Sequence, residues 1–145
     1  MKQLCRTFYL LVLMSALVLG GCGQQAPATP LVPLENVMWV LENYGETGKL
    51  QTPVPKTEIT IKFDNTNGKF GGSSGCNQYF GGYQVDKNKL TINAPMGSTM
   101  MACPEEIMNQ ESQYVSILAK AESYKIEEGK LTISGTGKIL VFKQK

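Results

Sequence analysis

The sequence contains no histidine, and its single arginine, Arg6, lies among the first residues. General acid–base catalysis most often depends on histidine, and catalytic zinc sites usually recruit it as a ligand. Proteins that bind nucleic acids normally carry a basic surplus in which arginine is prominent. These absences argue against all three classes. We expect a protein with no cofactor, no metal and no nucleic-acid partner.

Charge is balanced once the first residues are set aside. The chain has 14 basic and 12 acidic residues, and Lys2 and Arg6 are the only basic ones before Cys22. Without that leading segment the two signs cancel. Asp64 and Asp86 are the only aspartates, and each lies in a turn-forming sequence. They are more typical of turns than of catalysis, and no calcium loop, phosphate-binding loop or zinc spacing occurs.

The only long apolar run, residues 8–19, follows a basic start. Its length suits the apolar core of a signal peptide and is too short for an ordinary transmembrane helix. The run ends in Leu19-Gly20-Gly21-Cys22, which is similar to the bacterial lipobox, whose cysteine takes a diacylglyceryl group before cleavage. We therefore predict a lipoprotein signal peptide over residues 1–21 and a lipidated, palmitate-bearing Cys22. An ordinary secretory signal with a chance cysteine is the alternative.

Residues 22–33 hold three prolines and no charge, which is typical of an extended, semi-rigid tether. Residues 34–145 have the length of one ordinary domain. We expect the tether to join this domain to the membrane.

Apolar residues in the domain alternate with polar ones, as at Ile59, Ile61 and Phe63, and this pattern predicts strands that are buried on one face. We expect about seven antiparallel strands, at residues 37–41, 59–63, 83–85, 90–92, 124–126, 131–133 and 139–142, with the glycine-rich residues 68–83 pairing among them. Residues 45–55 and 94–102 are expected to be loops. The methionines of the second loop more often fill core gaps than form an adaptable contact surface, and both interpretations stay open.

One helix is predicted over residues 104–121. Pro104 suits the first helical position, and Glu105 and Glu106 complement the helix dipole rather than forming a catalytic pair. The apolar face predicted to pack on the sheet consists of Ile107, Tyr114, Val115, Leu118 and Ala121.

The chain is organised around residues 68–83, which hold six of its 15 glycines together with recurring aromatic residues. Glycine inside strands marks bulges and bends, so we expect two sharply bent strands across a small core. Regular alternation places Tyr79 and Tyr83 on one face and Phe80 on the other, unless a bulge at residues 81–82 breaks the register. We predict that one or two of these three side chains stay partly exposed and form a binding surface. The competing interpretation places all three in the core.

Residues 71–75 match the G-x-S-x-G pattern, with Ser73 as the potential nucleophile. In hydrolases this pattern needs a histidine partner and a helix after the serine. The sequence has no histidine, and no helical pattern follows Gly75. A flexible glycine-rich segment is therefore favoured, and a serine hydrolase is a distant alternative.

Two cysteines remain once Cys5 leaves with the signal peptide and Cys22 is lipidated. Exported domains usually reach an oxidising compartment, so we predict a disulfide between Cys76 and Cys103. Two buried free thiols that pack as small apolar groups are the alternative.

Several of these segments together resemble the META domain, the HslJ-like family of bacterial envelope proteins. They are Gly75-Cys76-Asn77 with the aromatic-glycine run after it, residues 89–92, and residues 99–105 ahead of Gln110-Glu111. The resemblance covers about residues 39–142. It implies an α+β fold in which a compact antiparallel sheet, curved towards a barrel, packs against one helix. It also implies a role in envelope or heat-shock stress, with novobiocin tolerance in some members, and it brings no catalytic residues.

These observations favour a non-enzymatic, membrane-anchored lipoprotein of the cell envelope, acting in the stress response or in assembly. Its expected partners are the membrane, through the lipid anchor, and an unknown envelope protein. A barrel that binds a small hydrophobic ligand or lipid is the second hypothesis. Because Gly23 rather than aspartate follows the cysteine, a Gram-negative host would place the protein on the outer membrane, facing the periplasm.

Overall fold

The computed structural model describes residues 32–145, so the predicted signal peptide, Cys22 and nearly all of the tether lie outside the described residues. The elements are β1 (Met38–Glu46), β2 (Lys49–Gln51), β3 (Thr60–Asp64), β4 (Lys69–Ser73), β5 (Gln78–Asp86), β6 (Lys89–Ser98), α1 (Glu105–Leu118), β7 (Ser123–Glu127), β8 (Lys130–Gly135) and β9 (Lys138–Gln144).

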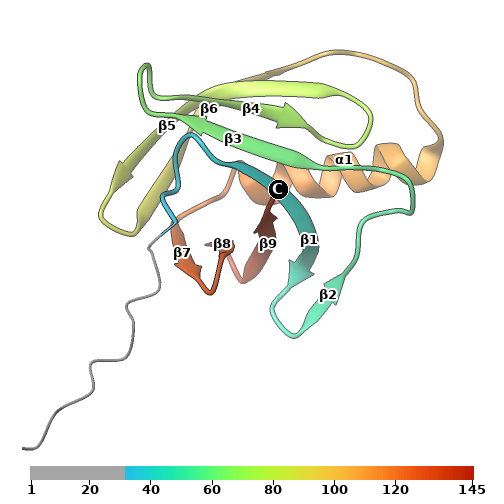
Figure 1. Cartoon of the computed structure of the whole chain (residues 1–145). Helices are drawn as coiled ribbons and strands as arrows, with labels where there is room; N and C mark the ends of the chain where they lie inside the picture. Colours follow the sequence, from blue (N-terminus) through green and yellow to red (C-terminus); the bar gives the residue numbers. More distant parts are fainter. Residues whose placement is uncertain (1–31) are drawn as a thin grey trace, which may run out of the picture.

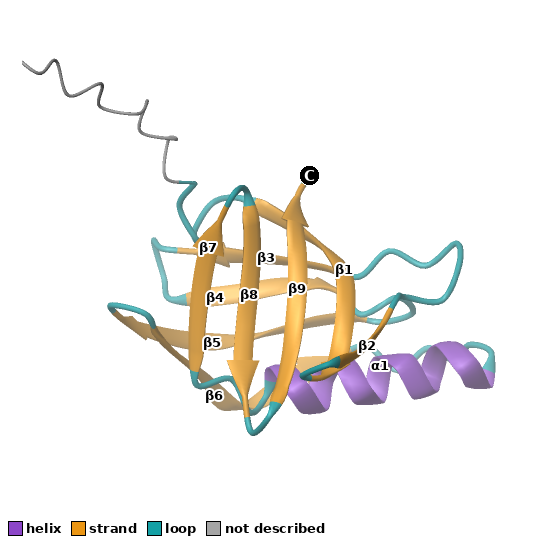
Figure 2. Cartoon of the chain, turned by 90° about the horizontal axis from the view of Figure 1, so that it is seen from below, coloured by secondary structure: helices purple, strands orange, loops and turns teal. Residues whose placement is uncertain are grey.

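The strands form one antiparallel sheet that closes on itself. Their order is β2-β1-β3-β4-β5-β6-β7-β8-β9, and β1 also pairs with β9, which completes a ring (Figure 1). In Figure 2, β3 to β6 run across β7, β8, β9 and β1, so the ring consists of two crossed halves. The predicted α+β class and curved antiparallel sheet are confirmed.

The interior of the ring is filled by the apolar positions that the alternation predicts. Ile59, Ile61 and Phe63 are fully buried, whereas Lys62 between them is exposed. Trp39, the single tryptophan, is also fully buried, and its Nε1 donates to the carbonyl oxygen of Leu34 at 2.9 Å. That bond fixes the incoming chain against the start of β1.

Helix α1 lies across one end of the ring and packs against β9, β1 and β8 (Figure 2). Pro104 is its N-cap rather than its first residue, and the helix ends at Leu118, earlier than predicted. Its buried residues are Gln110, Tyr114, Ile117 and Leu118, while Ile107 is only half-buried. Tyr114 and Leu118 of the predicted face are buried in the helix, but the prediction left out Ile117 and Gln110, and Ala121 lies beyond the helix end. A pattern of apolar spacing does not identify a buried glutamine.

The sheet has nine strands instead of about seven. Strand β2 lies in the predicted loop 45–55, and all three of its residues are exposed, so no alternation marks it. Strand β6 continues to Ser98 through the cis Ala94–Pro95 bond, into the predicted loop 94–102. The pairing of β5 with β6 shifts register between Phe80 and Gly82, and such an irregularity accommodates a proline within a strand.

Candidate functional site

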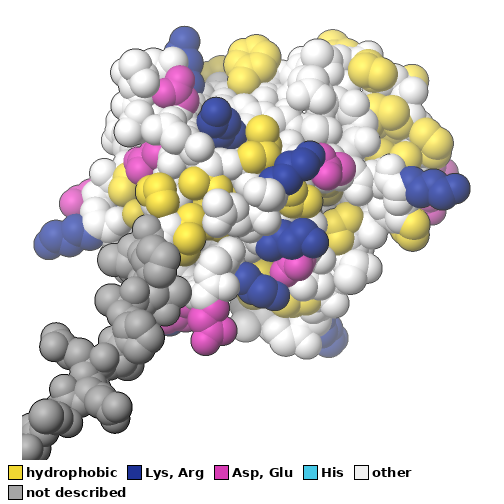
Figure 3. Space-filling model, in the orientation of Figure 1, with side chains coloured by type: hydrophobic (Ala, Val, Ile, Leu, Met, Phe, Trp, Pro, Cys, Tyr) yellow, Lys and Arg dark blue, Asp and Glu magenta, His cyan; other side chains and the backbone are white. Residues whose placement is uncertain are grey.

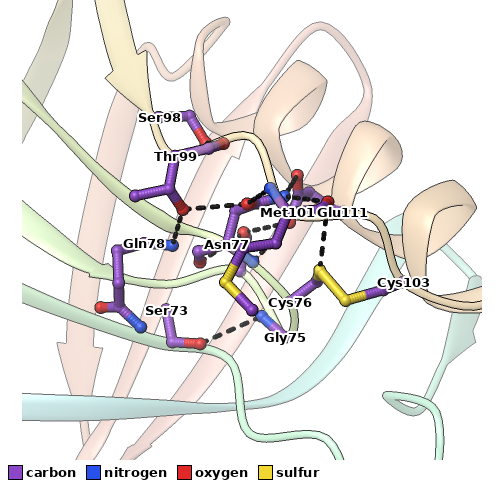
Figure 4. Close-up of a disulfide and its surroundings, with 11 residues drawn as sticks. Ser73, Gly75, Cys76, Asn77, Gln78, Ser98, Thr99, Met101, Cys103 and Glu111 are labelled. Atoms are coloured by element: carbon purple, nitrogen blue, oxygen red, sulfur yellow. Dashed lines mark hydrogen bonds between the residues drawn. A yellow bond between two sulfur atoms is a disulfide. The ribbon is translucent and has the colours of Figure 1, made fainter.

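Three segments that are far apart in the sequence meet at the end of the ring where α1 begins (Figure 4). They are residues 74–77 in the turn between β4 and β5, residues 99–103 between β6 and α1, and Gln110-Glu111 on the helix. Asn77 lies at their centre and is 1% exposed. Residues of all three segments are part of the META-like sequence pattern. Their geometry shows which contacts the residues of that pattern make.

The side chain of Asn77 is saturated with hydrogen bonds. Its Oδ1 accepts from Thr99 Oγ1 at 2.9 Å and from the Met101 backbone N–H at 2.7 Å. Its Nδ2 donates to Glu111 Oε1 at 2.8 Å and to the Met101 carbonyl oxygen at 3.5 Å. One asparagine thus joins the helix to the connection between β6 and α1.

The carboxylate of Glu111 completes this arrangement. Its Oε2 accepts from the Asn77 backbone N–H at 3.0 Å and from the Ser74 hydroxyl. Ser74 is fully buried, and Glu111 is half-buried. We call Ser74, Asn77, Thr99 and Glu111 the Asn77 cluster. A carboxylate that accepts three hydrogen bonds inside this cluster holds α1 to the sheet and is not free to act as a general base.

The predicted disulfide is present in the structure. Cys76 and Cys103 are bonded, with 6.2 Å between their Cα atoms, and the bond joins the β4–β5 turn to the residue before Pro104 (Figure 4). The disulfide and the Asn77 cluster therefore fasten the same two segments of chain, one covalently and one by hydrogen bonds.

The chain between β6 and α1 is well held but exposes its side chains. Met100 is 98% exposed and Met101 is 59% exposed. Asn77 nevertheless binds both polar backbone groups of Met101, and Cys76 Sγ lies 3.7 Å from the Met101 carbonyl oxygen. We call residues 99–103 the methionine loop. The sequence predicted more strongly that these methionines fill the core, and the structure shows that Met100 and Met101 do not.

Gln110 is a buried polar residue that the sequence analysis missed. It is 1% exposed; its Oε1 accepts from the Val54 backbone N–H, and its Nε2 donates to Thr57 Oγ1 at 3.1 Å. These bonds hold the connection between β2 and β3 against α1. A glutamine three residues after Ile107 and four before Tyr114 was the signal that could have identified it.

Tyr79 and Tyr83 are core residues. They are 2% and 7% exposed, so of the three side chains in the predicted binding surface these two belong to the core. Tyr79 Oη donates to the Thr60 carbonyl oxygen at 2.8 Å and pairs with the hydroxyl of Tyr114. Burial raises the pKa of Tyr79 and of Tyr114 well above the ordinary value, and it raises the pKa of Tyr83 to about 12.

Phe80 alone of the three stays exposed, at 62%. Regular alternation is the reason, since Phe80 points to the outer face between two inward-facing tyrosines. Its cross-strand partners are Gly71 on β4 and Gly97 on β6, and a Cβ built on Gly97 would lie 2.5 Å from the ring. The phenyl ring therefore lies over bare backbone. Whether Phe80 contacts a partner stays a prediction.

A groove of about 590 Å³ lies on the outer face of β3 and β4. Its lining residues are Asn36, Met38, Lys62, Asp64, Lys69, Phe70, Gly71 and Gly72. Gly72 is required by the fold, because a Cβ there would lie 2.0 Å from the Thr60 carbonyl oxygen. Neither Lys62 nor Lys69 forms a salt bridge within residues 32–145. The groove therefore offers two ammonium groups and one carboxylate, Asp64, beside a glycine floor, which leaves one positive charge in excess.

The structure does not form the hydrolase arrangement that residues 71–75 suggested. Ser73 ends β4, and the chain continues through a turn into β5 rather than into a helix. Its Oγ accepts from the Gly75 backbone N–H at 3.2 Å, which stabilises the turn. Within the described part of the chain, no group of three or more metal-binding side chains occurs. No helix there is long and apolar enough to cross a membrane.

A model of the META domain family matches residues 32–145. The chain belongs to the META domain family. The predicted family is thereby confirmed. The segments on which that prediction was based form the Asn77 cluster and the disulfide in the structure. No curated protein matches the chain.

Solved structures with the same fold have low sequence identity. An NMR structure of a protein from Burkholderia xenovorans has a TM-score of 0.65 at 22% identity and covers 83% of this chain and 97% of its own. A crystal structure of a DUF4847 family protein from Bacteroides vulgatus has a TM-score of 0.54 at 15% identity and covers 76% and 93%.

A further NMR structure has a TM-score of 0.59 at 23% identity, covering 78% of this chain and 95% of that one. At these identities the similarity shows the fold alone. All three chains consist almost wholly of the fold they share with this protein, so a domain of this fold forms as a separate chain.

Proposed function

We propose that this META protein is a lipid-anchored envelope protein whose domain binds another envelope component and catalyses no reaction. The supporting observation is the Asn77 cluster, in which the polar atoms that could serve catalysis are used to hold the methionine loop in place. A domain that fixes an exposed loop rather than a reactive group is suited to binding. Its cellular role would lie in the envelope stress response or in assembly.

The anchor in this proposal is a lipidated Cys22, and its support is the ordered signal sequence that ends at this residue. About ten residues separate Cys22 from the described domain, and an extended chain of that length spans at most about 36 Å. The domain would therefore stay close to the bilayer, on the periplasmic side of the outer membrane in a Gram-negative host.

A second candidate function is the binding of a small anionic ligand with an apolar part. The groove on β3 and β4 favours it, since Lys62 and Lys69 offer positive charge while Met38 is 39% exposed at its rim. Its volume lies within the range of about 300–1,000 Å³ typical of small-molecule sites. Phe80 lies on the neighbouring strand β5, opposite Gly71, which lines the groove.

Two measurements test the proposal. Intact-mass analysis of membrane-extracted protein should give a chain that begins at Cys22 and carries acyl mass; a chain that begins elsewhere, or one without acyl mass, refutes the anchor. Crosslinking in cells followed by mass spectrometry should yield one defined envelope partner. Hydrolysis of generic ester substrates that disappears in Ser73→Ala would instead establish an enzyme.

A further inference from the structure

Exposed apolar side chains gather where the sheet passes into the helix. Met100, Met101 and Met108 are 98%, 59% and 37% exposed. Figure 3 shows hydrophobic side chains collected at the right-hand end of the molecule, over the connection that Figure 1 draws between β6 and α1. Surface methionines are adaptable contact residues, because the unbranched thioether fits partners of different shape.

The backbone below these side chains is fixed although the side chains are free. Asn77 binds the N–H and the carbonyl oxygen of Met101, and the disulfide at Cys103 fixes the end of the loop. Ordering a loop before binding lowers the entropy lost on association. These bonds would join the helix to the sheet equally well if serine stood at positions 100 and 101. Internal stability therefore does not explain why apolar side chains occupy those positions.

The charge around the loop is negative. Between Lys89 and Lys120 the sequence contains no basic residue, and its charged residues are Glu105, Glu106 and Glu111. Glu111 is used within the Asn77 cluster, but Glu105 and Glu106 are exposed in the first turn of α1. The connection that Gln110 holds against the helix carries one basic residue near this contact, Lys56. Two free carboxylates thus outweigh one ammonium group.

We propose that the methionine loop, with Met108 and the first turn of α1, is a docking surface for a basic amphipathic helix of a partner protein. The apolar face of such a helix would cover Met100 and Met101, and its lysines or arginines would lie beside Glu105 and Glu106. An apolar helix face on an adaptable methionine surface is a recurring mode of peptide recognition. Opposite charges at the rim select the partner and speed the encounter.

The position of the methionine loop is compatible with the proposed lipid anchor. The role of the docking surface in the cell rests on that proposed anchor. In Figure 1 the described chain begins at the end of the molecule away from the connection between β6 and α1. A membrane attached before residue 32 would leave the methionine loop accessible to partners.

The test uses residues 32–145 and a labelled 18-residue peptide in which leucine and lysine repeat with a period of 3.6 residues. Fluorescence anisotropy should detect binding that weakens as salt is added. A peptide with the same leucines but glutamate for lysine should bind at least about tenfold more weakly. A scrambled leucine–lysine peptide, which lacks an apolar face, should also lose affinity.

Variants locate the contact. Met100→Gln with Met101→Gln should weaken binding at least about tenfold, the loss expected for central apolar contacts, and its exposed positions should leave unfolding unchanged. The matched control is Met38→Gln, which alters a methionine of 39% exposure at the rim of the groove and should change affinity by less than about twofold. Glu105→Gln with Glu106→Gln should weaken binding and flatten its salt dependence.

Three results would overturn the proposal. They are equal binding of the lysine and glutamate peptides, unchanged affinity in the methionine variant, or an equal loss in Met38→Gln. Vesicles of phosphatidylethanolamine and phosphatidylglycerol form a separate arm, and binding to them that depends on Met100 without any peptide binding would assign the loop to a lipid surface. Because the soluble domain carries no anchor, failure here is distinguishable from failure of the lipidation experiment.

Discussion

Asn77 and Glu111 are joined by two hydrogen bonds across 34 residues of sequence. Asn77 Nδ2 donates to Glu111 Oε1 at 2.8 Å, and the Asn77 backbone N–H donates to Glu111 Oε2 at 3.0 Å. The pair connects the turn after β4 to the second turn of α1. Because Asn77 also binds Thr99 and Met101, the pair fixes the methionine loop as well. One buried amide therefore organises the whole end of the domain.

Replacing Asn77 by alanine should lower the free energy of unfolding by about 3 kcal/mol. The change leaves the Met101 N–H and one Glu111 oxygen without their buried partner, and an unsatisfied buried polar group costs about 1–3 kcal/mol. Urea denaturation measures the effect. Asn65→Ala is the matched control, since Asn65 is an exposed turn residue and its loss should be close to neutral. A change of less than about 1 kcal/mol in Asn77→Ala would refute the structural role of the cluster.

Reduction of the Cys76–Cys103 bond should destabilise the domain by about 3.5 kcal/mol. The two cysteines are 27 residues apart, and the chain-entropy relation gives that magnitude for a loop of this length. Denaturation with and without reductant provides the comparison, and the double variant Cys76→Ser with Cys103→Ser controls for side effects of the reductant. Alkylation of unreduced, denatured protein should label neither cysteine, and labelling of both would show that no bond exists.

Tyr83 and Phe80 should respond oppositely to truncation. Tyr83 is 7% exposed, and its ring packs edge-on against that of Phe63, with 4.9 Å between the two ring centroids. Phe80, by contrast, is 62% exposed. Tyr83→Ala should therefore cost about 3–5 kcal/mol of stability, as large core truncations do. Phe80→Ala should cost less than about 1 kcal/mol. Thermal or urea unfolding decides between them, and a large loss in Phe80→Ala would show that its ring supports the fold.

Stability should fall as pH rises above about 10, the ordinary pKa of tyrosine. In the folded protein burial, followed by the nearby Glu35 carboxylate, raises the pKa of Tyr83 to about 12, so the folded state keeps a proton that the unfolded state has released. Fewer protons bound in the unfolded state mean that stability is lost between these two pKa values as pH rises.

The measurement is the urea midpoint of the protein and of Tyr83→Phe between pH 8 and pH 12. The variant keeps the buried ring but lacks the ionising hydroxyl, so its stability should decline less steeply above pH 10. Lysine ionisation affects both proteins equally and drops out of the comparison. Parallel curves for the two proteins would show that Tyr83 ionises at its ordinary pKa in the folded state.

Local patterns in the sequence determined much of the fold. Alternation at Ile59, Ile61 and Phe63 is a property of neighbouring residues, so it identified β3 and its buried face without any knowledge of the partner strands. The expected export to an oxidising compartment, with Cys5 and Cys22 set aside, was enough to predict the bond between Cys76 and Cys103. The same local alternation correctly separated Phe80 from its two tyrosine neighbours.

Other features depended on residues that only the tertiary structure brings together. Strand β2 is fully exposed and exists because β1 supplies its hydrogen bonds, so its own three residues carry no burial pattern. Gln110 is buried because Val54 and Thr57 satisfy its amide. Met100 and Met101 are apolar, and the sequence alone cannot distinguish them from core residues. They lie on the surface because Asn77 and the disulfide hold their backbone there, and contacts over such sequence separations cannot be seen in local periodicity.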